Sequence, residues 1–214
     1  MLNNLTTNYH CHLASIPDLD MFLNNSDHVY ISNALDNDEL DKHLLYINKP
    51  NLFFTTGQHP LYPENSITID RTVSLLEENK LFAIGEIGFD KRNPDFDWQK
   101  KVFLEFCDIA KQYEKPIIVH NVGYYYDLLS IIKKNFPDLQ FILHAFQGSV
   151  DVVKAYSKYD VIFSLHKDII KIKNSQNILK EIFNNHKYVF ETDVCKEGKH
   201  DVTETIDVIK RRLA

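Results

Sequence analysis

The 214-residue chain is short of several residue types, and each shortage argues against a class of protein. Its 6 glycines and 7 prolines are too few for a linker-rich or low-complexity chain. Its three cysteines are odd in number and far apart, which indicates reduced thiols in a cytosolic protein rather than a disulfide framework. The rest of the composition, with 44% hydrophobic and 25% charged residues, is typical of a globular protein, and the length predicts a single domain over residues 1–214.

Long apolar runs and an excess of positive charge are also absent. No stretch approaches the ~20 apolar residues of a membrane span, and the N-terminal MLNNLTTNYHCHL lacks the basic and apolar parts of a signal peptide. We therefore expect a cytoplasmic protein with no membrane association and no obligate protein partner. The net charge of −6 argues against a dedicated nucleic-acid-binding surface, although bound metal ions could supply positive charge to a nucleic-acid enzyme.

Short apolar runs alternate with longer amphipathic segments along the chain. Eight βα units in succession favour a (β/α)₈ TIM barrel, an α/β fold, whereas six would suggest an open doubly wound sheet. The expected strands are 5–12, 28–34, 52–57, 81–86, 116–120, 139–144, 160–165 and 187–191. The expected helices are 17–24, 36–47, 69–79, 97–113 with Asp97 as its cap, 124–135, 149–157, 175–185 and 201–213.

Imidazole and carboxylate side chains fall at or just past the expected ends of these strands. In the first strand, His10 and His12 flank Cys11, so both imidazoles share one face. The C-terminal ends of the strands of a barrel converge on one mouth, where the active sites of this fold lie. The other groups expected at this mouth are His59, Glu86, His120, His144 and Asp193.

Such a set of side chains predicts a metal centre. Four histidines and two carboxylates are enough for two divalent ions, with one carboxylate bridging them. Two ions ~3.5–4 Å apart can hold a hydroxide and clamp the attacking and leaving oxygens of a phosphoester. Imidazole ligands favour Zn²⁺, Mn²⁺, Co²⁺ or Ni²⁺ over Mg²⁺. A lone histidine at a strand end is more often a surface or hydrogen-bonded residue, but the whole set, in phase with the strands, favours metal binding.

Five segments carry a resemblance to a known family: YHCHL, TGQHP, AIGEIGFD continuing to PIIVH, HAFQGS and FETD, which together run from about residue 9 to 193. Over them the chain resembles the TatD family of metal-dependent hydrolases, within the amidohydrolase superfamily. The resemblance implies a (β/α)₈ barrel with one or two divalent ions (Zn, Mn, Co, Ni or Mg), and the members studied as enzymes are deoxyribonucleases.

The resemblance also implies roles for individual residues. Glu86 matches a bridging ligand, and Glu191 matches a supporting carboxylate rather than a ligand. His59 matches the histidine of a GxHP turn beside the metals and would hold the anionic group of the substrate. The expected mechanism uses a metal-bridging hydroxide as nucleophile, with Asp193 as general base. The matches to ligands of the first metal are His10, His12 and Asp193, and those of the second are His120 and His144.

The chain departs from the family pattern without losing a metal ligand. Asn8 replaces an Asp, Asn121 and Val122 replace Ser-Arg after the fifth strand, and HAFQG replaces HCFSG. No Pro follows ETD, and the chain ends 21 residues after Asp193, where the family usually continues. The lost Arg removes a phosphate contact. The expected candidates for substrate binding are therefore His59, Lys91, Arg92 and Tyr124.

These departures leave alternatives open. The expected substrate is a phosphodiester in DNA ends or single-stranded DNA, or a small phosphoester. A different hydrolase acting on a small ester or amide could use the same centre, because a fold does not fix a substrate. A catalytically weak, metal-binding relict is the third reading.

Overall fold

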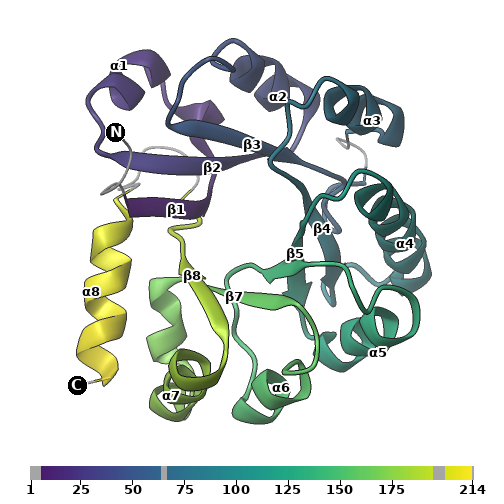
Figure 1. Cartoon of the computed structure of the whole chain (residues 1–214), viewed down its shortest axis with the longest axis vertical. Helices are drawn as coiled ribbons and strands as arrows, with labels where there is room; N and C mark the ends of the chain where they lie inside the picture. The colour runs from purple at the N-terminus through teal and green to yellow at the C-terminus, as the bar shows by residue number, and fades with distance from the viewer. Residues whose placement is uncertain (1–5, 64–66, 195–200, 214) are drawn as a thin grey trace.

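Eight parallel strands form a ring in chain order, with helices around the outside (Figure 1). This computed structural model describes residues 6–63, 67–194 and 201–213. The arrangement confirms the predicted (β/α)₈ barrel. The strands are β1 (Thr6–Cys11), β2 (His28–Ala34), β3 (Leu52–Thr56), β4 (Ala83–Asp90), β5 (Ile117–Val122), β6 (Phe141–Leu143), β7 (Val161–Leu165) and β8 (Lys187–Phe190).

The helices lie close to their predicted positions. Short 3-10 turns, η1 (Leu13–Ser15) and η3 (Lys167–Lys171), follow β1 and β7. Among the described residues no helix is both long and apolar enough to cross a membrane. The α-helices are α1 (Leu19–Asn24), α2 (Asn37–Leu44), α3 (Ile69–Glu77), α4 (Phe96–Gln112), α5 (Tyr125–Asn135), α6 (Val150–Ala155), α7 (Ser175–Asn185) and α8 (Val202–Leu213).

Two details of the sequence prediction are wrong in ways that concern the site. The fourth strand was expected to end at Glu86, but β4 continues to Asp90, so Glu86 lies in mid-strand. The cap of α4 is Asp95, whose carboxylate accepts from the backbone N–H of Trp98 at 2.9 Å, and not Asp97, which lies in the first turn. Both differences lie beside the loop that joins β4 to α4.

Aliphatic side chains fill the barrel interior below the mouth. A small buried cluster joins Ile31, Ala83, Ile118 and Ile142, which come from β2, β4, β5 and β6. A second, larger buried cluster contains the apolar side chains of the helices. Because Ile118 precedes His120 by two residues on β5, the two side chains share a face of the strand. The aliphatic cluster therefore forms a dry floor beneath the polar mouth.

The backbone just past β8 joins the first strand and closes the ring. Thr192 and Asp193 donate their N–H groups to the carbonyl of His10 at 3.3 and 3.1 Å, and His12 donates to the carbonyl of Val194 at 3.1 Å. Asn8 reinforces this seam, because its side chain donates to Thr192 Oγ1 at 2.8 Å and accepts from the N–H of Thr192 at 3.1 Å. The seam fixes the position of Asp193 relative to the two histidines of β1.

Cysteine chemistry plays no part in this arrangement of the described residues. Cys11 and Cys107 are buried free thiols, as their scattered positions predicted. Cys195 lies outside the described residues.

A buried histidine on α2 supports the turn after β1. Ser32 Oγ accepts from the N–H of Leu13 at 2.9 Å and lies 2.9 Å from Nε2 of His43. The His43 ring stacks on Phe54, with centroids 5.2 Å apart. Burial, with a smaller contribution from the charge of His12, lowers the pKa of His43 from 6.5 to about 4. His43 is therefore neutral in the folded protein at neutral pH.

This shift predicts a pH-dependent loss of stability. The folded-state pKa lies below the unfolded value, so between pH 6.5 and 4 the unfolded chain binds more protons and stability falls as the pH falls. From pH 7 to 5 we expect His43 to account for a loss of about 2 kcal/mol in the free energy of unfolding. Urea unfolding at the two pH values measures it.

The variant His43→Gln keeps an amide within reach of Ser32 and removes the titration. Its loss of stability between pH 7 and 5 should be smaller than that of the wild type by about the same 2 kcal/mol. An equal loss in both proteins would show that His43 does not carry the effect.

Candidate metal centre

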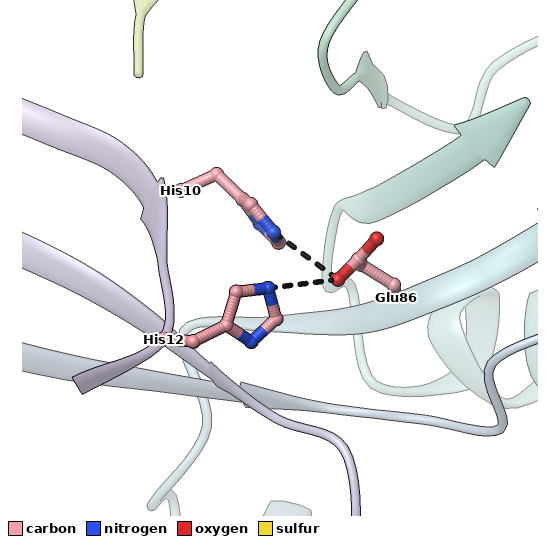
Figure 2. Close-up of side chains that lie close together, drawn as sticks. All are labelled: His10, His12 and Glu86. Atoms are coloured by element: carbon pink, nitrogen blue, oxygen red, sulfur yellow. Dashed lines mark ion pairs between the residues drawn. The ribbon is translucent and has the colours of Figure 1, made fainter. Parts of the chain in front are cut away.

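Glu86 lies at the centre of the predicted group of side chains. Its carboxylate is buried on β4, and Oε1 lies 3.1 Å from Nε2 of His10 and 3.5 Å from Nε2 of His12. Figure 2 shows both imidazoles reaching from β1 toward this one oxygen. The two histidines therefore approach Glu86 from the same side, as their alternation in the first strand predicted.

The other predicted groups complete the cluster. Oε2 of Glu86 lies 3.1 Å from Nε2 of His144, 3.3 Å from Nδ1 of His120 and 3.7 Å from Nε2 of His59. Oδ1 of Asp193 lies 3.7 Å from Nε2 of His10 and 3.6 Å from Nε2 of His12. The structure brings all seven predicted side chains together, although Glu86 and His120 reach the cluster from within their strands.

Two further carboxylates orient the histidines from outside. Asp90 accepts a hydrogen bond from Nε2 of His120 at 2.8 Å. Glu191 accepts from Nδ1 of His144 at 3.1 Å, and it also accepts from the Ala145 N–H at 2.9 Å and from the Ser164 hydroxyl. Each bond uses one ring nitrogen and leaves the other facing Glu86, the arrangement that metal-ligating histidines need.

Sequence reasoning assigned the supporting role to Glu191 but missed Asp90. An acidic residue four positions after Glu86 shares its strand face if the strand continues, and that even spacing was the available signal. Asn33 was also missed. Its amide donates to Oε1 of Glu86 at 3.2 Å and accepts from the Thr55 hydroxyl at 2.9 Å, so Thr55 orients Asn33 and Asn33 holds the carboxylate.

The electrostatics of the cluster keep its carboxylates ionised. Burial raises the pKa of Glu86, but the charges of His144 and His10 outweigh it and hold that pKa well below its usual range. For His144, burial lowers the pKa, but Glu86 and Glu191 raise it well above 6.5. The pKa of Asp193 falls to about 2 because His12, His144 and His10 outweigh burial. Carboxylates gathered among imidazoles thus need positive charge from histidine protons or from a cation.

The donor set fits a divalent cation. Three groups offer ligand atoms that all lie within 4.8 Å of one another. The ring nitrogens of His10 are buried and make no hydrogen bond within the described part of the chain, although Nε2 faces Glu86. A bound ion would give such nitrogens a partner and displace the histidine protons. The three groups are His10, His12 and Glu86; His10, His144 and Asp193; and His59, Glu86 and His120.

The candidates for substrate binding are placed differently from one another. Arg92 lines a cavity of about 160 Å³ over the cluster, together with His59. Lys91 is exposed, and its aliphatic chain lies over Gly123. The ring of Tyr124 packs against Phe96, with centroids 4.8 Å apart. His59 and Arg92 are therefore the two candidates that the structure brings to the cluster.

Comparison with known proteins identifies the family. The model of the TatD related DNase family matches residues 8–207. The chain belongs to the TatD family. A metal-dependent hydrolase of Methanocaldococcus jannaschii is 30% identical over 203 residues, with 77% of this chain and 78% of that protein covered. Human deoxyribonuclease TATDN3 is 26% identical over 200 residues, with 81% and 72% covered.

A solved structure shows the same fold. The TatD homologue YjjV of Escherichia coli superposes with a TM-score of 0.83 at 20% identity, covering 99% of this chain and 91% of that one. The expected family and barrel are thus both confirmed, and this TatD protein is a metal-dependent hydrolase. Its imidazole-rich cluster supports the use of divalent metal.

The ligand assignment predicts partial loss of metal from a double variant. Replacing His120 and His144 by Ala removes two of the imidazoles that face Glu86, so bound metal per chain should fall while the His10–His12 side stays at least partly filled. Elemental analysis after gel filtration measures the ratio. His28→Ala, at the opposite end of β2, is the matched control. Unchanged metal content in the double variant would refute the assignment.

Proposed function

We propose that this chain, acting as one domain over residues 1–214, is a divalent-metal-dependent phosphodiesterase that cleaves DNA. The family model and the human relative are both named for DNase activity. The observation that carries the proposal is the convergence of four histidines on Glu86, with Asp193 against two of them, because phosphodiester hydrolysis needs concentrated positive charge and an activated water. DNA ends, single-stranded DNA or small phosphoesters are the proposed substrates.

The cluster would hold one or two ions of Zn, Mn, Co, Ni or Mg. His10, His12 and Asp193 would bind the first and His120 and His144 the second, with Glu86 shared between them. Bound there, divalent ions supply a water of lowered pKa and positive charge for the phosphate oxygens. Asp90 and Glu191 would keep the rings in place as the substrate enters and leaves.

Asp193 is suited to accept a proton. Its side chain is 36% exposed and lies beside His10 and His12, whereas the side chain of Glu86 is 4% exposed. An ionised carboxylate at the edge of the cavity can receive a proton and pass it to solvent. We assign Asp193 the role of general base. The buried Glu86 serves instead as the negatively charged ligand shared between the ions.

His59 is suited to donate a hydrogen bond without carrying charge. Burial lowers the pKa of His59 to about 3, so the ring is neutral at neutral pH. Its Nδ1 accepts from the N–H of Leu61 at 3.1 Å, which leaves the proton on Nε2. That N–H faces the cluster and lines the cavity with Arg92. We assign it to an oxygen of the phosphate, where charge grows in the transition state.

Arg92 takes the role of the arginine missing after His120. Its Nε and Nη2 bind the carboxylate of Asp90, with Nε at 2.9 Å from Oδ1, and Asp90 in turn binds His120. Nη1 makes no hydrogen bond to a described residue, and the side chain is 61% exposed. Asp90 thus orients both a candidate ligand and a cation, and the free edge of the guanidinium is available to a phosphate.

The first test is metal-dependent cleavage of a fluorescent single-stranded oligonucleotide. We expect slow, sequence-independent cleavage with Mn²⁺, Zn²⁺ or Mg²⁺, and a fall in kcat by about 100-fold or more in Asp193→Asn, because an amide cannot accept the proton. Asp207→Asn, an exposed position on α8, is the matched control. If the fully metallated wild type cleaves no DNA or RNA, a small ester, amide or phosphoester becomes the substrate, and no turnover at all indicates the relict.

The second test separates substrate binding from chemistry. Arg92→Gln should raise KM about tenfold with little change in kcat, since a charge-assisted hydrogen bond present before and during reaction is lost. The slope of the logarithm of the binding constant against the logarithm of the salt concentration should also become shallower, by about the contribution of one phosphate contact. Lys101→Gln removes the same charge from the exposed face of α4 and should leave both unchanged. A fall in kcat with KM unchanged would exclude this role.

A further inference from the structure

A second cavity of about 410 Å³ opens beside the cluster. It shares His120, His144 and Asp193 with the smaller cavity that Arg92 lines. The two cavities therefore flank the same three side chains. The rest of the larger cavity comes from the end of β5, the loops after β5 and β6 and the start of α5, namely Asn121, Val122, Gly123, Tyr125, Ala145 and Gln147.

The two cavities differ in charge and in size. Arg92 gives the smaller one a cation, whereas these six residues of the larger one are all uncharged. The larger volume lies within the range of about 300–1,000 Å³ that accommodates small organic ligands, and 160 Å³ lies below it. Asp193 at the shared border is an anion. A second phosphate would find no cationic side chain among the six residues that only the larger cavity has.

Asn121 lines this cavity and carries a buried amide donor without a partner among the described residues. The residue is only 8% exposed, and its Oδ1 accepts from the N–H of Tyr124 at 3.0 Å, which fixes the orientation of the amide. Its Nδ2 is buried and has no hydrogen-bond partner among the described residues. A buried donor left without a partner is unfavourable, so an acceptor on a ligand would stabilise this arrangement.

Tyr125 and Gln147 add hydrogen-bonding capacity nearby. The Tyr125 hydroxyl accepts from the N–H of Gln147 at 3.1 Å, and its ring packs edge-on against Phe146, with centroids 5.4 Å apart. Burial raises the pKa of Tyr125, so the hydroxyl keeps its proton and can donate it. The side chain of Gln147 is exposed at the rim. Amide, phenol and aliphatic groups together match an uncharged ring with acceptors at its edge.

We infer that this cavity binds the uncharged organic group of the phosphoester, a nucleoside, while the phosphate lies on the shared side chains and faces Arg92. The inference rests on the proposed function and specifies its substrate. A substrate with one phosphate and one nucleoside matches both cavities, because the phosphate faces Arg92 and the nucleoside meets uncharged groups. A polyanion that runs through the larger cavity would place further phosphates against those uncharged groups. Substrates with one nucleoside and one scissile phosphate are therefore preferred over long duplex DNA.

Two probes test the division without requiring turnover. Deoxynucleosides and inorganic phosphate are titrated separately into metal-loaded protein by calorimetry. We expect Asn121→Ser, which keeps an oxygen acceptor for the N–H of Tyr124, adds no charge and removes the amide donor, to weaken deoxynucleoside binding about tenfold and phosphate binding less than twofold. Arg92→Gln should weaken phosphate binding about tenfold and deoxynucleoside binding less than twofold. Gln147→Glu, an exposed substitution, provides a second variant, and it should weaken deoxynucleoside binding in the same sense.

Asn177→Ser makes the same chemical change in the exposed first turn of α7 and should alter neither affinity. Metal content and melting temperature confirm that each variant is folded and loaded. The inference is overturned if no deoxynucleoside binds the wild type, or if neither cavity variant weakens its binding. Nucleoside binding without cleavage of any phosphodiester would instead refute the proposed function, so the two failures are distinguishable.

Discussion

The structure depends on one buried carboxylate. Glu86 lies in mid-strand in a fully buried β4, where an unpaired charge would cost several kcal/mol. Side chains from four strands, or from the residue just after a strand, contact this carboxylate. His10 lies on β1, His120 on β5 and Asn33 on β2, and His144 follows β6. The barrel therefore converges on a single anion. Because several imidazole rings surround that anion, the cluster is preorganised for a cation.

Positioning comes from hydrogen bonds that lie outside the cluster. Asp90 joins His120 to Arg92, and Glu191 joins His144 to the backbone at Ala145 and to β7 through Ser164. The contacts between Asn8 and Thr192 across the closing seam place Asp193 beside β1. Asn in place of Asp at position 8 therefore serves the seam: its amide both donates to and accepts from Thr192, which a carboxylate could not do.

The succession of apolar runs was enough to predict the barrel, and the positions of polar residues at or just past the expected strand ends were enough to predict the seven clustered side chains. His10 and His12, for example, follow from period 2 alone. Asp90 could not be found, because the strand was expected to stop at Glu86 and the continuation depends on pairing with β5, where Asp90 lies opposite Val122. The choice of Tyr124 as a substrate contact has a similar origin. One residue on a helix is a turn of about 100°, so only the packing of Tyr124 on Phe96 distinguishes it from Tyr125, which lines the cavity.

The uncharged residues that follow His120, Asn121 and Val122, also bear on how the site can work without an arginine at that position. A cation on the His120 side would compete with the metal for Asp193 and draw the phosphate toward the larger cavity. With Asn121 and Val122 in that place, positive charge is confined to the metal cluster and to Arg92 across the mouth. Asp90 neutralises part of that charge, so the guanidinium orients a phosphate more than it attracts one from a distance. In the proposed complex, selectivity would then depend on the shape and hydrogen bonding of the organic group, which would lie against the end of β5 and the loops after β5 and β6.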